Sequence, residues 1–175
     1  MLIKEIRGKY PNIATDCYIA ENATIVGDVT IGQSCSVWFN AVIRGDVNSI
    51  VIGNKVNIQD GAIIHCTYEK HPTVIGNNVS IGHNAMVHGC VVHDNVLIGM
   101  GAIVMDDCVI HSNTIIAAGA VVTQHTVVEP GSIYAGVPAK KVKDIGASDF
   151  AGEIERIANN YVMYSGWFKE ADQEK

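Results

Sequence analysis

An aliphatic residue recurs at every sixth position over long stretches of this chain. Six residues cannot complete a helical repeat, but they can form one short strand and one turn. Stacked units of this kind bury a continuous column of aliphatic side chains, and no unit is stable alone. The period therefore predicts an all-β solenoid. The aliphatic positions are Ile13, Ile19, Ile25, Ile31, Val37 and Ile43, then Ile52, Ile58, Ile64, Ile75, Ile81, Val87 and Val92, and finally Ile98, Val104, Ile110, Ile116, Val122 and Val128.

This repeat resembles that of the hexapeptide-repeat proteins over residues 10–140. The resemblance implies a left-handed parallel β-helix in which three hexapeptides make one triangular coil, with about six coils in this chain. We expect a single domain, with the left-handed β-helix over residues 1–145 and a C-terminal α-helix over residues 146–175 that packs on it. The helix is indicated by an apolar stripe with steps of three and four residues at Phe150, Ile154, Ile157, Tyr161 and Tyr164.

Composition narrows the classes of function. The chain has 12 Lys and Arg against 18 Asp and Glu, and a net charge of −6 argues against nucleic acid or a membrane surface as a partner. No apolar segment has the length of a membrane span or of a signal peptide, so we expect a cytoplasmic protein. The five cysteines include no CxxC pair and do not suggest a disulfide framework. Cys17, Cys35 and Cys108 fall in the small inward slot of the repeat and are interpreted as packing residues.

The period is interrupted twice. Three extra residues lie between Ile43 and Ile52, around the segment DVNSIV, and five lie between Ile64 and Ile75, around CTYEKHPTV. Extra residues in a solenoid emerge as loops on one face, which is often the binding face.

The positions of three histidines within the repeat indicate which of them lie close together. With three repeats per coil, as the resemblance implies, His65 and His88 occupy the same slot on adjacent coils. Adjacent parallel strands lie about 4.8 Å apart, so the two imidazoles can converge on one metal ion. His83 lies one repeat before His88, on a neighbouring face, and can reach such an ion only from another chain.

The segments IRGD (43–46), IQDGAIIHC (58–66) and IGHNAMVHG (81–89) occur in the order and slots found in gamma-class carbonic anhydrases. The chain most resembles the short bacterial members of that family. The resemblance implies a homotrimer with Zn²⁺ at each subunit interface, held by His65 and His88 of one chain and His83 of the next. Three imidazoles also suit Fe²⁺, Co²⁺ or Ni²⁺.

The resemblance also implies roles for five other residues. Arg44 and Asp46 belong to an Arg–Asp pairing that builds the subunit interface, and Asp60 is the expected partner of Arg44. Gln59 is expected to hydrogen-bond the metal-bound water. The hydroxyl of Tyr161 is expected to approach the metal pocket, although simple packing in the helix stripe is an equally open interpretation.

The implied activity is that of a lyase, the reversible hydration of carbon dioxide to bicarbonate. The archetypal enzymes carry a glutamate after the Arg-x-Asp motif, where this chain has Val47, and a longer acidic loop with a proton-shuttle glutamate. Here only Glu69 or His71 can take the place of that shuttle, so we expect weak hydration limited by proton transfer. Three alternatives stay open: an acyltransferase with an acyl-CoA donor, a thioester or ester hydrolase, and a non-catalytic scaffold.

Overall fold

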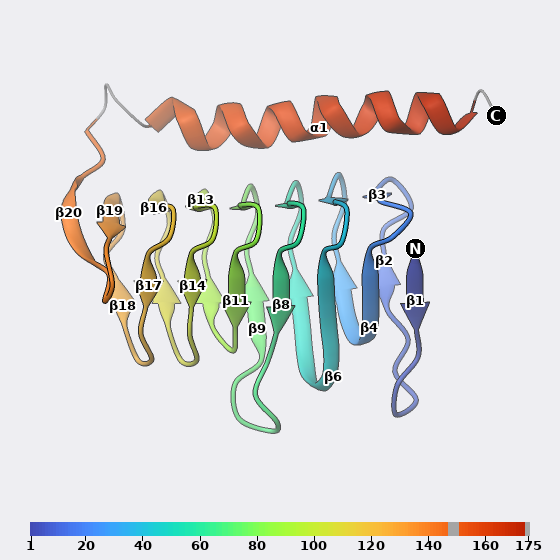
Figure 1. The fold of residues 1–175 in the computed structure, drawn as a ribbon, viewed down its shortest axis with the longest axis horizontal. Helices are drawn as coiled ribbons and strands as arrows, with labels where there is room; N and C mark the ends of the chain where they lie inside the picture. The colour runs from blue at the N-terminus through green and yellow to red at the C-terminus, as the bar shows by residue number, and fades with distance from the viewer. Residues whose placement is uncertain (147–150, 174–175) are drawn as a thin grey trace.

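The chain forms a parallel β-solenoid with one long helix along its side (Figure 1), and the computed structural model describes residues 1–146 and 151–173. This confirms the predicted solenoid and C-terminal helix. The first sheet has twelve strands: β1 (Leu2–Lys4), β2 (Asn12–Ile13), β4 (Thr24–Ile31), β6 (Val42–Ile52), β8 (Ile63–His65), β9 (Thr73–Ile75), β11 (Met86–His88), β12 (Val91–Val92), β14 (Ile103–Val104), β15 (Val109–Ile110), β17 (Val121–Val122) and β18 (Val127–Val128).

The second sheet has eight strands: β3 (Tyr18–Ile19), β5 (Ser36–Val37), β7 (Asn57–Ile58), β10 (Ser80–Ile81), β13 (Val96–Ile98), β16 (Thr114–Ile116), β19 (Ser132–Ala135) and β20 (Lys140–Asp144). Strand β20 is antiparallel to β19, and the other seven strands of this sheet each belong to one coil of the described chain. The solenoid therefore exceeds the expected six coils, because β19 adds a coil beyond the last regular aliphatic position.

Aliphatic side chains stack in register along the axis of the solenoid. Ile25 pairs with Ile43, Ile43 with Ile64, Ile64 with Val87 and Val87 with Val104, and all five are fully buried. Each of these residues removes most of its side chain from water, which stabilises the fold by roughly 1.5–3 kcal/mol per side chain. The residues that recur with the six-residue period are thus the ones that form the hydrophobic core.

The two interruptions of the period have different structures. Residues 66–72 form the predicted loop, which is closed by an antiparallel bridge between Thr67 and His71 and is the longest loop in Figure 1. The prediction of a loop after Ile43 is wrong, because the extra residues continue strand β6, which pairs with β4 across the corner of the prism. Gly45 permits this close pairing, since a Cβ there would lie 2.5 Å from the backbone oxygen of Asp28.

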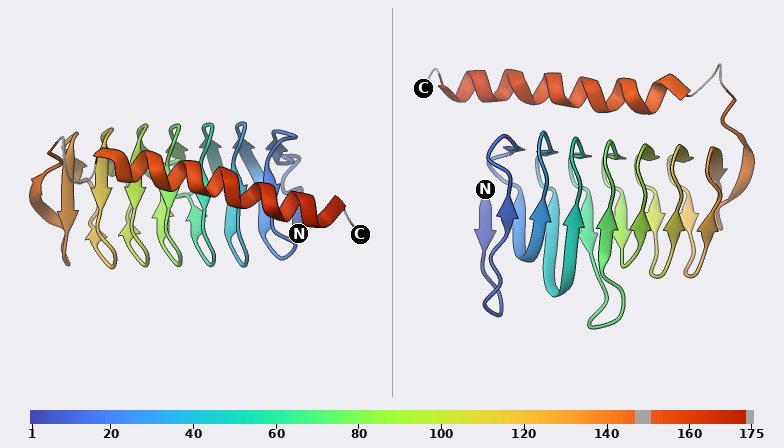
Figure 2. Two further views of the ribbon diagram at one scale, coloured as in Figure 1. Left: turned by 90° about the horizontal axis from the view of Figure 1, so that it is seen from above. Right: turned by 180° about the vertical axis from the view of Figure 1, so that it is seen from behind.

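Helix α1 (Ala151–Gln173) lies lengthwise over the eight-stranded sheet (Figures 1 and 2). Its aromatic residues pack on the first coils: the ring centroids of Trp38 lie 5.4 Å from Tyr161 and 5.3 Å from Phe168. Ile154 is buried, and Phe150 lies outside the described residues. Within the described part of the chain, no helix has both the length and the apolar character that crossing a membrane requires.

Two adjacent valines test the inward column. Val128 is fully buried and Val127 is 59% exposed on the same strand. Val128→Ala should lower the free energy of unfolding by about 2 kcal/mol, because two methyl groups and their contacts are lost from the core. Val127→Ala should change it by less than about 0.5 kcal/mol. Urea unfolding measures both, and equal losses in the two variants would contradict the assigned register.

Candidate metal centre

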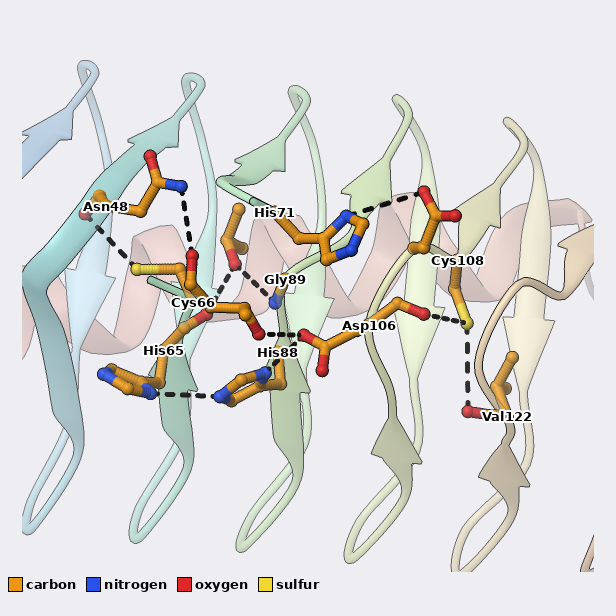
Figure 3. A network of polar contacts seen from close by, with 12 residues as sticks. Asn48, His65, Cys66, His71, His88, Gly89, Asp106, Cys108 and Val122 are labelled. Carbon is orange, nitrogen blue, oxygen red and sulfur yellow. Dashed lines mark hydrogen bonds and ion pairs between the residues drawn. The ribbon is translucent and has the colours of Figure 1, made fainter. Parts of the chain in front are cut away.

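Two histidine rings meet on adjacent coils of the solenoid. His88 on β11 pairs in register with His65 on β8, as the repeat phase predicts, and Nδ1 of His65 lies 3.0 Å from Nε2 of His88 (Figure 3). Two nitrogens bound tetrahedrally to Zn²⁺ at 2.0–2.1 Å stand about 3.3 Å apart. The facing nitrogens therefore have the separation of two ligands on one ion.

Asp46 holds the outer nitrogen of His65. Nε2–H of His65 donates to Oδ1 of Asp46 at 3.0 Å, and Arg44 pairs with the other carboxylate oxygen at 2.5 Å. Burial opposes the charge on Asp46, but the hydrogen bonds from His65 and Arg44 outweigh it and lower the pKa of that carboxyl. Burial lowers the pKa of His65, so its ring is neutral near pH 7, which is the form that binds metal.

Asp106 accepts a hydrogen bond from the outer nitrogen of His88, as Asp46 does from His65. Nδ1–H of His88 donates to Oδ1 of Asp106 at 2.7 Å, and the hydroxyl of Thr67 donates to the same oxygen at 2.8 Å. Burial of Asp106 is outweighed by these hydrogen bonds, which lower its pKa. Gly89 makes room for the contact, because a Cβ there would lie 2.1 Å from Oδ1 of Asp106.

The two carboxylates together decide which nitrogens face each other. Each ring gives its one N–H to a carboxylate, Asp46 for His65 and Asp106 for His88, so lone pairs remain on the facing nitrogens. Two lone pairs 3.0 Å apart repel unless a cation lies between them. Carboxylates that orient ligand histidines in this way are typical of metal sites, and the donor set therefore fits a divalent metal.

His83 lies at a different corner, after strand β10 of the second sheet. Its Nδ1–H donates to Asp60 at 2.9 Å, its Nε2 lies 3.4 Å from the hydroxyl of Tyr161, and its backbone N–H donates to Gln59 at 3.2 Å. Burial, with Asp60 nearby, raises the pKa of Tyr161 to about 12, so its hydroxyl keeps its proton.

The predicted site residues thus form two separate groups within one chain. The first group contains Arg44, Asp46, His65 and His88, and the second contains Gln59, Asp60, His83 and Tyr161. Arg44 and Asp60 have partners within their own groups. Among residues 1–146 and 151–173, no three His, Cys, Asp or Glu side chains are arranged to hold a metal ion.

Comparison with known proteins places the chain in a family. The profile of the family described as bacterial transferase hexapeptide (six repeats) matches residues 72–101 and 89–124, and such repeats fit the predicted left-handed β-helix. Gamma carbonic anhydrase 1 of Arabidopsis thaliana is 39% identical over 158 residues, which is 87% of this chain and 57% of that protein. A carbonic anhydrase of Geobacillus kaustophilus is 47% identical over 174 residues, covering 99% and 94% of the two chains. The chain belongs to the gamma carbonic anhydrase family.

Solved structures agree with this assignment of fold. A Bacillus cereus protein, described as a candidate acetyltransferase, superposes with a TM-score of 0.94 at 36% identity and covers 97% of this chain and 98% of its own. The description of that protein names acetyl transfer, whereas the two relatives from Geobacillus and Arabidopsis carry the carbonic anhydrase name. Proteins with this fold are therefore described by two different activities. The fold alone does not decide between them, and the side chains of the site have to.

Two positions depart from the pattern expected of gamma carbonic anhydrases. Val47 is half-buried and packs against the core. In the loop between β8 and β9, Glu69 adopts a φ of 53°, and His71 lies 3.7 Å from Asp107 with 30% of its side chain exposed. In Figure 3 the ring of His71 points away from the rings of His65 and His88, and its ion-pair partner is Asp107.

An apolar cavity of about 360 Å³ lies beside His83, between α1 and the solenoid. Leu97 and Met100 line it from the coils, and Ile157 and Tyr161 line it from the helix. Its apolar walls and single polar end suit a compact apolar group. Sequence reasoning did not find this cavity, because it exists only where the helix lies over the coils.

The role of Asp106 in this family member is testable with its neighbour as a control. Asp106→Asn should weaken zinc binding by about 10–100-fold, because an amide no longer enforces the His88 tautomer that turns a lone pair toward the ion. Asp107→Asn should leave the affinity unchanged, since Asp107 contacts His71 and His125 instead. Competition with a chromophoric chelator measures both, and equal affinities for all three proteins would contradict the assignment.

Proposed function

We propose that this protein is a metal-dependent carbonic anhydrase that hydrates carbon dioxide reversibly, with Zn²⁺ held at the interfaces of a homotrimer. The observation that carries the proposal is the pair of lone-pair nitrogens of His65 and His88, 3.0 Å apart and oriented by Asp46 and Asp106. Membership of the gamma carbonic anhydrase family supports the same reaction. Fe²⁺, Co²⁺ and Ni²⁺ are compatible with the same imidazole donors.

The third ligand requires another copy of the chain. His83 stands at a different corner, and 39% of its side chain is exposed. The face between the two corners carries a row of exposed apolar residues, with Met86 on β11 paired to Ile63 and Ile103 on the neighbouring strands. Burying this row between subunits is favourable. A cyclic trimer brings His83 of one chain to the His65–His88 pair of the next.

The residues of the chain prepare the reaction. A bound zinc ion lowers the pKa of a coordinated water to about 7 and so supplies a nucleophile at neutral pH. Gln59 is held by Asn57 and by the His83 backbone, which leaves one amide N–H free to orient that water. Tyr161 stays protonated and can donate a hydrogen bond beside His83.

The apolar cavity beside His83 favours a second candidate, the hydrolysis of a thioester or ester with a compact apolar acyl group. Carbon dioxide has three heavy atoms and needs far less than about 360 Å³. Acyl transfer from acyl-CoA is a further alternative that the fold allows. It predicts that the protein binds coenzyme A and no metal. Metal content and activity together separate these functions.

Mixed trimers test the proposed ligand set. His83→Ala and His88→Ala chains should each lose metal as homotrimers, because every site lacks one ligand. When the two chains are assembled together, each mixed trimer should recover about one of its three sites, since one interface combines an intact pair with an intact His83. Dual-tag purification followed by metal analysis measures the recovery.

The control mixes His65→Ala with His88→Ala chains. Both chains lack a ligand on the same side, so no interface in that mixture is intact and metal should stay absent. A monomeric mass of the metal-loaded wild type, or metal retained by His83→Ala homotrimers, would overturn the trimeric site.

Proton transfer is expected to limit hydration in the zinc-loaded protein. Added imidazole buffer should raise kcat while leaving kcat/KM for carbon dioxide nearly unchanged, because the buffer carries the proton after carbon dioxide has reacted. Val47→Glu should partly replace the buffer, since it places a carboxylate beside Asp46. Stopped-flow hydration assays measure both effects.

Fast turnover that does not depend on buffer would contradict this limit and would assign the relay to a residue of the chain, with His71→Ala as the variant to examine. Metal-loaded protein without hydration at any buffer concentration would instead favour the hydrolase.

A further inference from the structure

Two cysteines stack on the first two coils, away from the histidine pair. Cys17 precedes β3 and Cys35 precedes β5, and the two strands pair in register with Tyr18 opposite Ser36. The N–H of Tyr18 donates to the carbonyl of Cys35 at 3.0 Å, which continues the ladder to the cysteines. Parallel strands lie about 4.8 Å apart, within the range of Cα separations of about 4.4–6.8 Å that disulfides span.

The surroundings of the two thiols differ. Cys35 is 1% exposed, and its Sγ lies 3.1 Å from the carbonyl of Gly53 inside the solenoid. Cys17 is half-buried and lines an open cavity of about 400 Å³ together with Asp16 and Lys169 of α1. A small solute can therefore reach Cys17, while Cys35 lies behind it.

The outer thiol, whose Sγ donates to the carbonyl of Gly32 at 3.0 Å, also has a lowered pKa. The neighbouring Cys35 side chain outweighs burial and, helped by the charge of Lys169, lowers the pKa of Cys17 to about 7. Burial raises the pKa of the thiols of Cys66, Cys90 and Cys108. Because the thiolate is the reactive form, Cys17 is the thiol of this chain best suited to attack an electrophile at neutral pH.

We propose that Cys17 is an oxidation site for small hydroperoxides, and that Cys35 resolves the product into a disulfide that links the first two coils. Both side chains also pack in or against the core, as the repeat predicts, and the proposal adds a redox role to that packing. It depends on neither the metal nor the proposed hydration activity.

The chemistry balances with one hydroperoxide. The Cys17 thiolate attacks one peroxide oxygen, the O–O bond breaks, and the leaving oxygen takes a proton, which yields a sulfenic acid and water from hydrogen peroxide. The sulfur of Cys35 then attacks the Cys17 sulfur, so that the S–S bond forms and the S–O bond breaks. The leaving hydroxide takes the Cys35 proton as a second water. Two thiols are oxidised by two electrons and one peroxide is reduced.

The test uses the full-length, zinc-loaded protein and hydrogen peroxide. After a stoichiometric dose, free thiols are alkylated and the non-reduced protein is mapped by mass spectrometry. A peptide pair joined through Cys17 and Cys35 is the expected product, and Cys66→Ser should form it to the same extent. Oxidation that leaves these two cysteines fully alkylated, or that joins other cysteines first, would overturn the proposal.

A trapping variant separates the two steps. Cys35→Ser should accumulate a sulfenic acid at position 17 that dimedone labels, whereas Cys17→Ser should react with peroxide at least about tenfold more slowly at pH 7. Circular dichroism and mass in solution verify that each variant is folded. Dimedone labelling of Cys35→Ser at Cys66, Cys90 or Cys108 but not at position 17 would refute the assignment, and the wild-type map decides the matter if a variant does not fold.

Discussion

The in-register stacking of parallel strands is the constraint on which the rest of this structure depends. Each strand takes its backbone hydrogen bonds from the coil before it and the coil after it, so a residue stands about 4.8 Å from its counterpart in the next coil. A slip of one residue would turn the aliphatic column outward and expose the core. The same register that buries Ile64 against Val87 therefore sets His65 against His88 and Cys17 beside Cys35.

Stacking places the two imidazole rings of His65 and His88 side by side, and carboxylates on neighbouring coils stabilise that arrangement. Two imidazoles at 3.0 Å would compete for one proton if each lacked an outer acceptor. Asp46 and Asp106 supply those acceptors from neighbouring coils, and the low pKa of each keeps it charged and accepting. Glycines at 45 and 89 permit the close approach, because a Cβ at either position would collide with a neighbouring coil.

Helix α1 adds functions that the coils alone cannot provide. Tyr161 reaches His83, Ile157 closes one wall of the apolar cavity, and Lys169 lies beside Cys17. Figure 2 shows the helix lying lengthwise over successive coils of the solenoid. The helix therefore links the corner of His83 to the first coil, since it contacts residues at both places.

The six-residue period by itself determined the solenoid and its buried column, because the period sets which side chains point inward. The shared slot of His65 and His88 followed from the period together with the three repeats per coil that the family resemblance implies. The period could not determine that β6 would turn a corner as a continuous strand, since that depends on the matching length of β4. It also gave no sign of Asp106, which lies in a turn where no spacing rule specifies the direction of a side chain. Only the tertiary structure brought that carboxylate to His88 and divided the predicted site residues between two corners, because those contacts join residues from different coils and from the helix.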